Sequence, residues 1–333
     1  KNMTRNLKIA LVTGGAGFIG SHLVDLLLKK NFRVIVIDNL SGGRLDNLKQ
    51  HKNNKKLTFK KIDINNISKN EKIFKNVDYV FHFAGIGDIV PSIETPSNYM
   101  MTNVQGTVNV LEASRFSKVK KFIYAASSSC YGINNYRTKE DGKINPQYPY
   151  ALSKYLGEQA AFHWHKVYGL PVNSIRIFNA YGPRVRTTGV YGAVFGVFLK
   201  QKLKKKALTV VGSGKQARDF IYVTDVVKAF FKAATTNNDG EIFNLGSDKP
   251  QSVNQLAKLI GGKIVYIPDR PGEPRKTWAN ISKIKKKLNW KPIVNFKDGV
   301  RNMLGQIDQW KTAPLWSPKS INLATKTWFK YLK

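Results

Sequence analysis

The chain opens with a short apolar run, residues 8–12, that leads directly into a glycine-rich turn at 13–20. A nearly continuous apolar run of this length is typical of a strand buried on both faces of a parallel sheet. Apolar residues recur at helical spacing after the turn. Gly14 and Gly17 allow a sharp turn and a close approach of backbone N–H groups to an anion, and Gly20 lets the helix pack against the sheet. The sequence therefore predicts a strand–turn–helix unit whose helix N-terminus faces a pyrophosphate.

A second expected strand, 33–37, ends at Asp38, roughly twenty residues after the glycine turn. In dinucleotide-binding units an acidic residue at this point binds the adenosine ribose hydroxyls. A carboxylate there repels a 2′-phosphate, so we expect NAD rather than NADP. A purely structural glycine turn is the alternative, because such loops also simply connect a strand to a helix.

Further apolar runs predict more strands along the chain, separated by segments with helical periodicity. Long helical patterns cover 96–116 and 150–168. This alternation is typical of an α/β fold with a doubly wound parallel sheet, in which ligands bind at the carboxyl edge. The strands expected after the opening unit are 57–62, 77–83, 121–126, 172–178, 219–223, 242–245 and 263–267.

The pattern becomes less regular after residue 180, with glycines, prolines and short elements. We expect residues 1–180 to form a Rossmann-type NAD-binding domain, to whose sheet a segment at about 218–246 returns. Residues 181–217 and 247–333 are expected to form a smaller, interwoven substrate-binding lobe.

The formal net charge of +34 raises the question of nucleic acid, an anionic membrane or an anionic substrate as partner. The lysines are scattered over expected helices and loops, which favours a solvated surface, so no nucleic-acid partner is expected.

No apolar run approaches the roughly 20 residues needed to cross a bilayer. The single cysteine, Cys130, excludes an intramolecular disulfide, and Cys/His clusters with metal-ligand spacing are absent. With a polar start and no secretory signal, we expect a cytoplasmic protein without a metal site or membrane contact.

Tyr150 and Lys154 lie four residues apart, on the same face of an expected helix. A nearby cation favours the phenolate and lowers the pKa of a tyrosine toward that of a general base. The preceding strand, 121–126, ends in the serines 127–129, at the sheet edge where a ligand is expected. We therefore predict Tyr150 as a general base, supported by Lys154 and a serine hydroxyl. A surface tyrosine behind a serine-rich loop is the alternative.

Together these motifs resemble the extended short-chain dehydrogenases/reductases, and most closely the UDP-galactose 4-epimerase group of NAD-dependent nucleotide-sugar epimerases. The resemblance extends over nearly the whole chain. It is carried by residues 13–20, 38–40, 63–64, 82–85, 103, 127–132, 150–154, 176–184, 218–220 and 270–273.

The resemblance implies roles for individual residues. The catalytic residues would be Ser127, Tyr150 and Lys154. The residues implied to contact NAD are Gly14, Gly17, Phe18, Ile19, Asp38, Asn39, Asp63, Ile64, Phe83, Ala84, Gly85, Asn103, Tyr150, Lys154 and Phe178. The residues implied to contact a UDP-sugar are Ser127, Ser129, Asn179, Val194, Arg218, Arg270, Glu273 and Thr277. Two arginines are also suited to a doubly charged diphosphate on electrostatic grounds.

The chemistry implied is oxidation of a UDP-sugar at C4 with Tyr150 as the base, rotation of the tethered 4-keto sugar, and reduction from its opposite face. NAD would be regenerated in each cycle, so we expect it to stay tightly bound.

Dehydratases of this superfamily carry an Asp-Glu pair at the positions of Ser128 and Ser129, and UDP-glucuronate decarboxylases carry a glutamate in the same stretch; both are absent here. Cys130 resembles the cysteine of some GDP-sugar 3,5-epimerases, but we expect it to be a buried structural residue.

Thr277 matches a position where a tyrosine restricts some epimerases to UDP-glucose and UDP-galactose, while smaller residues accompany tolerance of N-acetylated sugars. The loop 189–194 also resembles that of UDP-N-acetylglucosamine 4-epimerases. We therefore expect UDP-GlcNAc and UDP-GalNAc as substrates besides the plain hexoses, with a UDP-glucuronate 4-epimerase or another epimerase or dehydratase of the superfamily as the alternative.

A non-catalytic NAD- or RNA-binding relative is a more distant alternative, which the joint presence of the serine, tyrosine and lysine disfavours.

By resemblance we also expect a homodimer that pairs the helices 96–116 and 150–168. The aromatic residues of the segment 313–332 are expected to pack a terminal helix on the second lobe, without a role in the chemistry.

Overall fold

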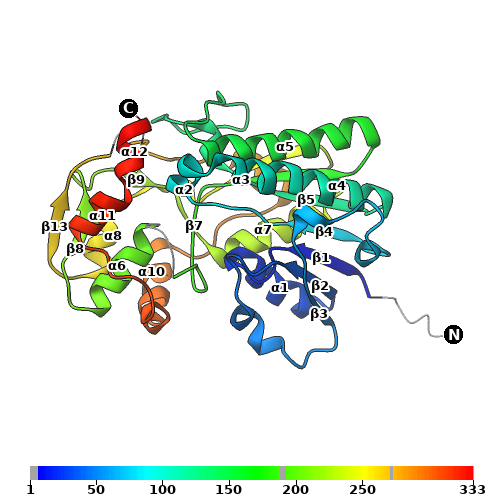
Figure 1. Cartoon of the computed structure of the whole chain (residues 1–333), viewed down its shortest axis with the longest axis horizontal. Helices are drawn as coiled ribbons and strands as arrows, with labels where there is room; N and C mark the ends of the chain where they lie inside the picture. Colours follow the sequence, from blue (N-terminus) through cyan, green and yellow to red (C-terminus); the bar gives the residue numbers. More distant parts are fainter. Residues whose placement is uncertain (1–6, 188–192, 271–272, 333) are drawn as a thin grey trace.

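The computed structural model of the chain describes residues 7–187, 193–270 and 273–332. Seven strands form one parallel sheet, which confirms the expected doubly wound α/β fold. The strands are β1 (Ile9–Thr13), β2 (Arg33–Asp38), β3 (Leu57–Lys61), β4 (Tyr79–His82), β5 (Lys121–Ser127), β6 (Val172–Ile177) and β11 (Glu241–Leu245). Their order across the sheet is β11-β6-β5-β4-β1-β2-β3, and Figure 1 labels β1 to β5 of this sheet. The segment expected at 242–245 thus rejoins the sheet, beside β6.

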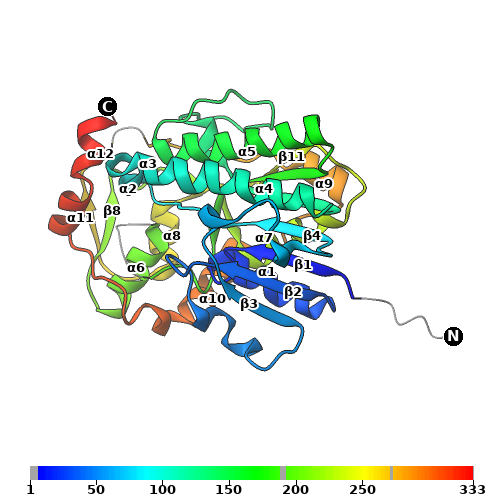
Figure 2. The same ribbon diagram turned by 45° about the vertical axis from the view of Figure 1, so that its right-hand side comes forward.

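Helices cover both faces of this sheet. The main ones are α1 (Phe18–Lys29), α4 (Thr107–Phe116), α5 (Pro149–Tyr168) and α7 (Val223–Thr235). Successive strand residues point to opposite faces, so Ala10 and Val12 of β1 lie in a core with α1 and α7, whereas Leu11 lies in a core with α4 and α5. Figures 1 and 2 show the two helix pairs on opposite sides of the sheet. With both faces covered, the carboxyl edge of the sheet is left for a ligand.

The helix predicted over 96–116 is interrupted. Residues Pro96–Met100 (α3) are α-helical, but Met101–Gly106 (η4) form a π-helical turn before α4 begins. The Asn103 side chain in this turn accepts from the Ile86 backbone N–H at 2.8 Å and donates to Ser153 Oγ at 2.9 Å. Such turns are common at functional sites, and here the turn directs Asn103 toward the loop that follows β4.

The second lobe has its own core, which is rich in aromatic side chains. Its elements are α6 (Val194–Leu203), β8 (Leu208–Val211), β9 (Ala217–Arg218), β12 (Gln251–Ser252), α8 (Val253–Ile260), β13 (Ile264–Ile267) and α10 (Phe296–Leu304). Tyr181 stacks on Phe195 with ring centroids 4.7 Å apart, and Phe220 stacks on Phe296 at 5.2 Å.

The strand expected at 219–223 is shorter than predicted. It is β10 (Phe220–Tyr222), which pairs with β7 (Asn179–Tyr181) between the two lobes and leads directly into α7.

Short elements complete the fold. They are η1 (Leu45–His51), η2 (Ile64–Asn66), η3 (Lys72–Phe74), α2 (Ile89–Glu94), η5 (Ser128–Tyr131), α9 (Ser282–Leu288), η6 (Ile307–Trp310), α11 (Pro318–Ala324) and α12 (Lys326–Tyr331). Within the described ranges no helix is long and apolar enough to cross a membrane.

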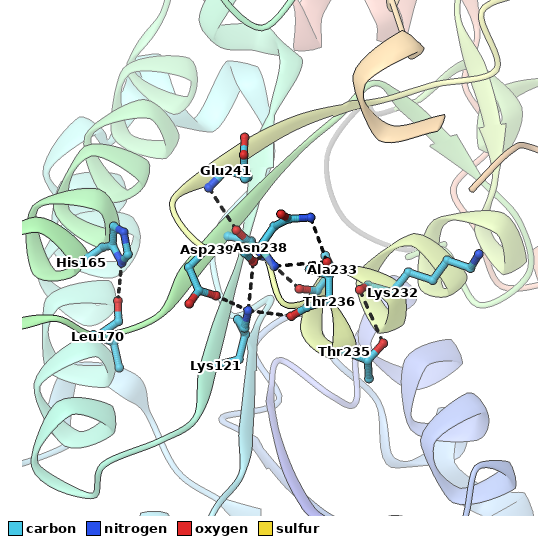
Figure 3. A network of polar contacts seen from close by, with 11 residues as sticks. Lys121, His165, Leu170, Lys232, Ala233, Thr235, Thr236, Asn238, Asp239 and Glu241 are labelled. Carbon is cyan, nitrogen blue, oxygen red and sulfur yellow. Dashed lines mark hydrogen bonds and ion pairs between the residues drawn. The ribbon is translucent and has the colours of Figure 1, made fainter. Parts of the chain in front are cut away.

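A buried lysine anchors the returning strand β11 to the rest of the sheet. Figure 3 shows the Lys121 ammonium, at the start of β5, surrounded by the turn between α7 and β11. It donates to the carbonyl oxygens of Thr236 and Asn238 at 2.9 and 3.0 Å and pairs with the Asp239 carboxylate. Asn173 of β6 extends the network, because it donates to Asn238 O and accepts from the N–H of Glu241. The turn is therefore held against two central strands.

We predict that Lys121→Met lowers the free energy of unfolding by about 1–3 kcal/mol, because the buried carbonyl groups lose their donor. Lys120→Met is the matched control: this neighbouring lysine has a side chain that is 71% exposed and pairs with Asp78, and its loss should cost less than about 1 kcal/mol. Urea unfolding monitored by circular dichroism measures both. Equal stability of the two variants would contradict the anchoring role of Lys121.

Candidate active site

The glycine turn after β1 has the close packing that the sequence predicts. Gly14 has a φ of +66°, and a Cβ placed on it would lie 2.8 Å from the backbone nitrogen of Ala84. A Cβ on Gly20 would lie 2.3 Å from the carbonyl oxygen of Gly14. Gly17 precedes α1 without a side-chain cap, so the first N–H groups of α1 have no intrahelical acceptor and are available to an anion. Phe18 and Ile19 belong to this first turn.

The ends of β2 and β3 bring the predicted adenosine residues together. The Asp38 carboxylate is 7% exposed and accepts from the backbone N–H groups of Ala16 at 3.0 Å and Leu40 at 2.8 Å. Burial raises the pKa of Asp38, and these two donors oppose the shift. Asn39 donates to the Asp63 carboxylate at 3.0 Å, next to Ile64 in η2. Ribose hydroxyls and an adenine would find carboxylate and amide partners here.

The loop after β4 closes the other side of the groove. The backbone N–H groups of Phe83 and Ala84 donate to the carbonyl and the hydroxyl of Thr13, each at 3.1 Å. A Cβ on Gly85 would lie 2.9 Å from Asn103 Oδ1 and 3.8 Å from the Lys154 ammonium. The predicted NAD residues that follow β1 and β4, together with those of η4 and α5, therefore lie around the loop after β4.

These residues fit a dinucleotide. The glycine turn forms a cradle that side chains would fill, the uncapped N-terminus of α1 would face a pyrophosphate there, and the Asp38 carboxylate would accept from ribose hydroxyls.

The predicted catalytic residues lie at the end of β5 and in the first two turns of α5. Ser127 Oγ lies 2.8 Å from Ser129 Oγ, and Ser127 is close enough to Tyr150 to affect the pKa of its phenol. Tyr150 is in the first turn of α5 and Lys154 is one turn further. The Lys154 ammonium lies 4.6 Å from the centroid of the Tyr124 ring, and its side chain is buried.

The expected lowering of the Tyr150 pKa is wrong for the protein without its cofactor. Burial raises the pKa of Tyr150, the Ser127 hydrogen bond opposes this, and the Asp88 carboxylate raises the pKa further. Burial also lowers the pKa of Lys154 to about 8, although the Glu158 carboxylate favours its charged form. Burial therefore sets the direction of the Tyr150 pKa shift, which the four-residue spacing of the pair did not predict. Burial likewise raises the pKa of Cys130 to about 12, as suits a buried structural thiol.

A cavity of about 540 Å³ extends from this catalytic end into the second lobe. Every residue predicted to contact a substrate lines it: Ser127, Ser129, Asn179, Val194, Arg218, Arg270, Glu273 and Thr277. Phe178, predicted to contact the cofactor, also lines it. The predicted residues Gly189, Val190, Tyr191 and Gly192 of the loop 189–194, and Pro271 and Gly272 of the 270–273 motif, lie outside the described residues.

Two arginines that line the cavity share one carboxylate. Arg218 and Arg270 each approach Glu273 to 3.5 Å. Burial lowers the pKa of Arg218, and Glu273 opposes that shift. The cluster keeps one excess positive charge, which suits a diphosphate.

Thr277 contributes a small side chain to the wall beside this cluster. Its hydroxyl donates to Asn179 Oδ1 at 2.8 Å and accepts from the Asp219 backbone N–H at 3.0 Å. The hydroxyl is thus held by Asn179 of β7 and by Asp219, the residue before β10. The small side chain lines the cavity and leaves room where a larger residue would project.

Some lining residues were missed by the sequence analysis. The Tyr148 ring stacks on Tyr150, with centroids 6.3 Å apart and an angle of 7° between planes. Its position directly before Pro149 and Tyr150 in the sequence could have identified Tyr148 as a residue of the cavity wall. Trp328 of α12 and the Arg186–Asp88 ion pair, at 2.6 Å, also line the cavity, and no local motif identifies them because their neighbours there are distant in sequence.

The comparisons with known proteins agree with this geometry. The model of the NAD dependent epimerase/dehydratase family matches residues 10–246. UDP-glucose 4-epimerase of Mycolicibacterium smegmatis is 34% identical over 299 residues, which cover 87% of this chain and 95% of the relative.

Two solved structures are similar over nearly their whole length. One is UDP-N-acetylglucosamine 4-epimerase from Methanobrevibacter ruminantium in complex with UDP-N-acetylmuramic acid, with a TM-score of 0.86 and 33% identity over 91% of this chain and 99% of that one. The other is UDP-glucuronic acid 4-epimerase from Bacillus cereus in complex with UDP-glucuronic acid and NAD, with a TM-score of 0.85 and 32% identity over 90% and 99%. The chain therefore belongs to the NAD-dependent epimerase/dehydratase family and is an NAD-dependent enzyme acting on nucleotide sugars.

Proposed function

We propose that the protein is a 4-epimerase of UDP-sugars that interconverts UDP-glucose with UDP-galactose and UDP-GlcNAc with UDP-GalNAc. The observation that carries the proposal is the cavity itself. Its wall combines Ser127 and Tyr150 with the Arg218–Arg270–Glu273 cluster. A sugar at the first position and a diphosphate at the second is the arrangement of a UDP-sugar.

Tyr150 would accept the proton of the sugar C4 hydroxyl, while Ser127 would hold the same oxygen by a hydrogen bond. Bound NAD supplies the hydride acceptor and a positive charge that favours ionisation of neighbouring acids. Lys154 adds a second cation in a dry environment, where charges interact more strongly than in water. Because burial raises the pKa of Tyr150, ionisation of the phenol would depend on these two positive charges.

The diphosphate would remain bound at the two arginines while the sugar rotates. Arg218 and Arg270 have side chains that are only 15% exposed, so their contacts with phosphate are little screened by solvent. A sugar anchored only through its diphosphate can present either face to the catalytic end, as 4-epimerisation requires.

The charges at the sugar end support a neutral sugar. Among the described residues that line the cavity, the cations are Arg186, Arg218 and Arg270, and each has a carboxylate partner. Asp88, the partner of Arg186, is close enough to raise the pKa of Tyr150. A uronate would add a further negative charge there.

UDP-glucuronate 4-epimerisation is the second candidate. It is favoured by Arg186, which could pair with a uronate carboxylate after leaving Asp88. Dehydration and decarboxylation are less well supported, because serines occupy positions 128 and 129, where those relatives carry acidic residues.

A homodimer is also part of the proposal. Leu152 and Leu156 of α5 are 39% and 38% exposed, and Phe116 of α4 is 45% exposed. Leu152 and Leu156 are four residues apart and share one helix face. Pairing of α4 and α5 with a second copy would cover these apolar side chains.

A screen of UDP-, GDP- and dTDP-sugars, with products separated by stereochemistry, tests the proposed function. We expect UDP-galactose from UDP-glucose and UDP-GalNAc from UDP-GlcNAc, without loss of water or carbon dioxide. Conversion of UDP-glucuronate alone would favour the second candidate, and a 4-keto-6-deoxy product would contradict epimerisation.

Tyr150→Phe removes the proposed base while keeping the ring in the cavity wall. We predict a fall in kcat of about 10²- to 10⁴-fold, with unchanged NAD content and UDP affinity. Tyr168→Phe, which loses an exposed phenol at the other end of α5, is the control and should retain full activity. A Tyr150→Phe variant with native kcat would rule out the phenol as the base.

A further inference from the structure

The segment 313–332, which we call the tail segment, runs along the cavity from one lobe to the other. At the far end of the cavity Ala313, Pro314 and Trp316 belong to the wall. The Trp316 carbonyl oxygen accepts from Gln201 of α6 at 2.9 Å, which fixes the start of the tail segment on the second lobe. The tail segment also lies outside residues 10–246 that the family model matches.

The last described helix of the tail segment, α12, lies on the NAD-binding domain. It packs against α2, and both ribbon views show the two helices side by side (Figures 1 and 2). The Thr327 hydroxyl donates to the Glu94 carboxylate of α2 at 3.0 Å. The expectation that a terminal helix packs on the second lobe is therefore wrong for α12, which contacts α2 of the other lobe.

Trp328 is the residue of α12 that reaches the cavity wall. It is 4% exposed, although the Phe329 next to it is 40% exposed. Its ring centroid lies 6.3 Å from that of Tyr148, whose other neighbour is the Tyr150 ring. The Arg270 guanidinium lies 5.7 Å from the indole. Trp328 thus contacts both Tyr148, which stacks on the proposed base, and one of the proposed diphosphate arginines.

We infer that Trp328 is a substrate-binding residue, and that the tail segment forms the wall against which the sugar of a UDP-sugar packs. The inference takes its substrate class from the proposed function. A sugar joined to a diphosphate at Arg270 and presenting C4 to Tyr150 must occupy the space between these groups. An indole there offers a large, rigid apolar surface at low entropic cost. Thr277 has a small side chain and leaves room in another part of the wall. The large Trp328 ring restricts the space on its own side and thereby helps select the sugar.

The test compares binding of UDP with binding of UDP-glucose and UDP-GlcNAc by calorimetry to the NAD-loaded protein. We expect Trp328→Ala to weaken binding of both UDP-sugars at least tenfold and binding of UDP less than threefold. Trp328→Phe should keep UDP-sugar affinity within about threefold of the native protein. Phe329→Ala removes an exposed aromatic ring from the same helix and should bind all three ligands as the native protein does.

Equal weakening for UDP and the UDP-sugars, or no weakening in a folded Trp328→Ala variant, would overturn the inference. If that variant does not fold, hydrogen exchange of the native protein decides. UDP-GlcNAc or UDP-glucose should slow amide exchange over residues 318–332 more than UDP does, and equal exchange would overturn the inference. Failure of the proposed function is distinguishable, since it would appear as missing epimer product or missing UDP-sugar binding in the native protein.

Discussion

The catalytic end of the molecule depends on one buried ion pair that fixes helix α5 on the sheet. Arg176 of β6 donates to the Glu158 carboxylate of α5, with an Nη2–Oε1 distance of 2.6 Å, and Ser174 donates to the same carboxylate at 2.7 Å. Both charged side chains are at most 3% exposed, so removing either would leave an uncompensated buried charge. Tyr150 and Lys154 lie on the same helix, two turns and one turn before Glu158. The pair helps to fix their position over the sheet edge, and the Glu158 carboxylate favours the charged form of Lys154, which burial disfavours.

In the proposed function, one lobe binds the cofactor and both lobes contribute to the substrate site. The parallel sheet brings the ends of β1, β2, β4 and β5 to one edge, which provides the glycine turn, Asp38 and Ser127. The second lobe adds the guanidinium groups of Arg218 and Arg270 across the cavity. The proposed chemistry needs both, because a base without a diphosphate anchor would release the oxidised sugar, and an anchor without a base would only bind it.

Local patterns in the sequence predicted most of this arrangement. The strands could be identified because a buried parallel strand is a short apolar run, and the glycine turn because close backbone approach requires glycine. The π-helical turn at Asn103, the raised pKa of Tyr150 and the crossing of the tail segment could not be predicted in this way. Each depends on groups that are distant in sequence and meet only in the fold. Desolvation in particular is a property of the packed structure, which residue spacing does not report.

The most direct test of the account follows the hydrogen at C4 of the substrate. UDP-glucose carrying deuterium at C4 is incubated with the protein in ordinary water, and the UDP-galactose formed is analysed by mass spectrometry and NMR. The account predicts that the product keeps the deuterium at C4, because this hydrogen leaves and returns inside the cavity while Tyr150 exchanges only the hydroxyl proton. Replacement of the deuterium by hydrogen from water would contradict it, since the inversion would then proceed through loss of a proton from carbon.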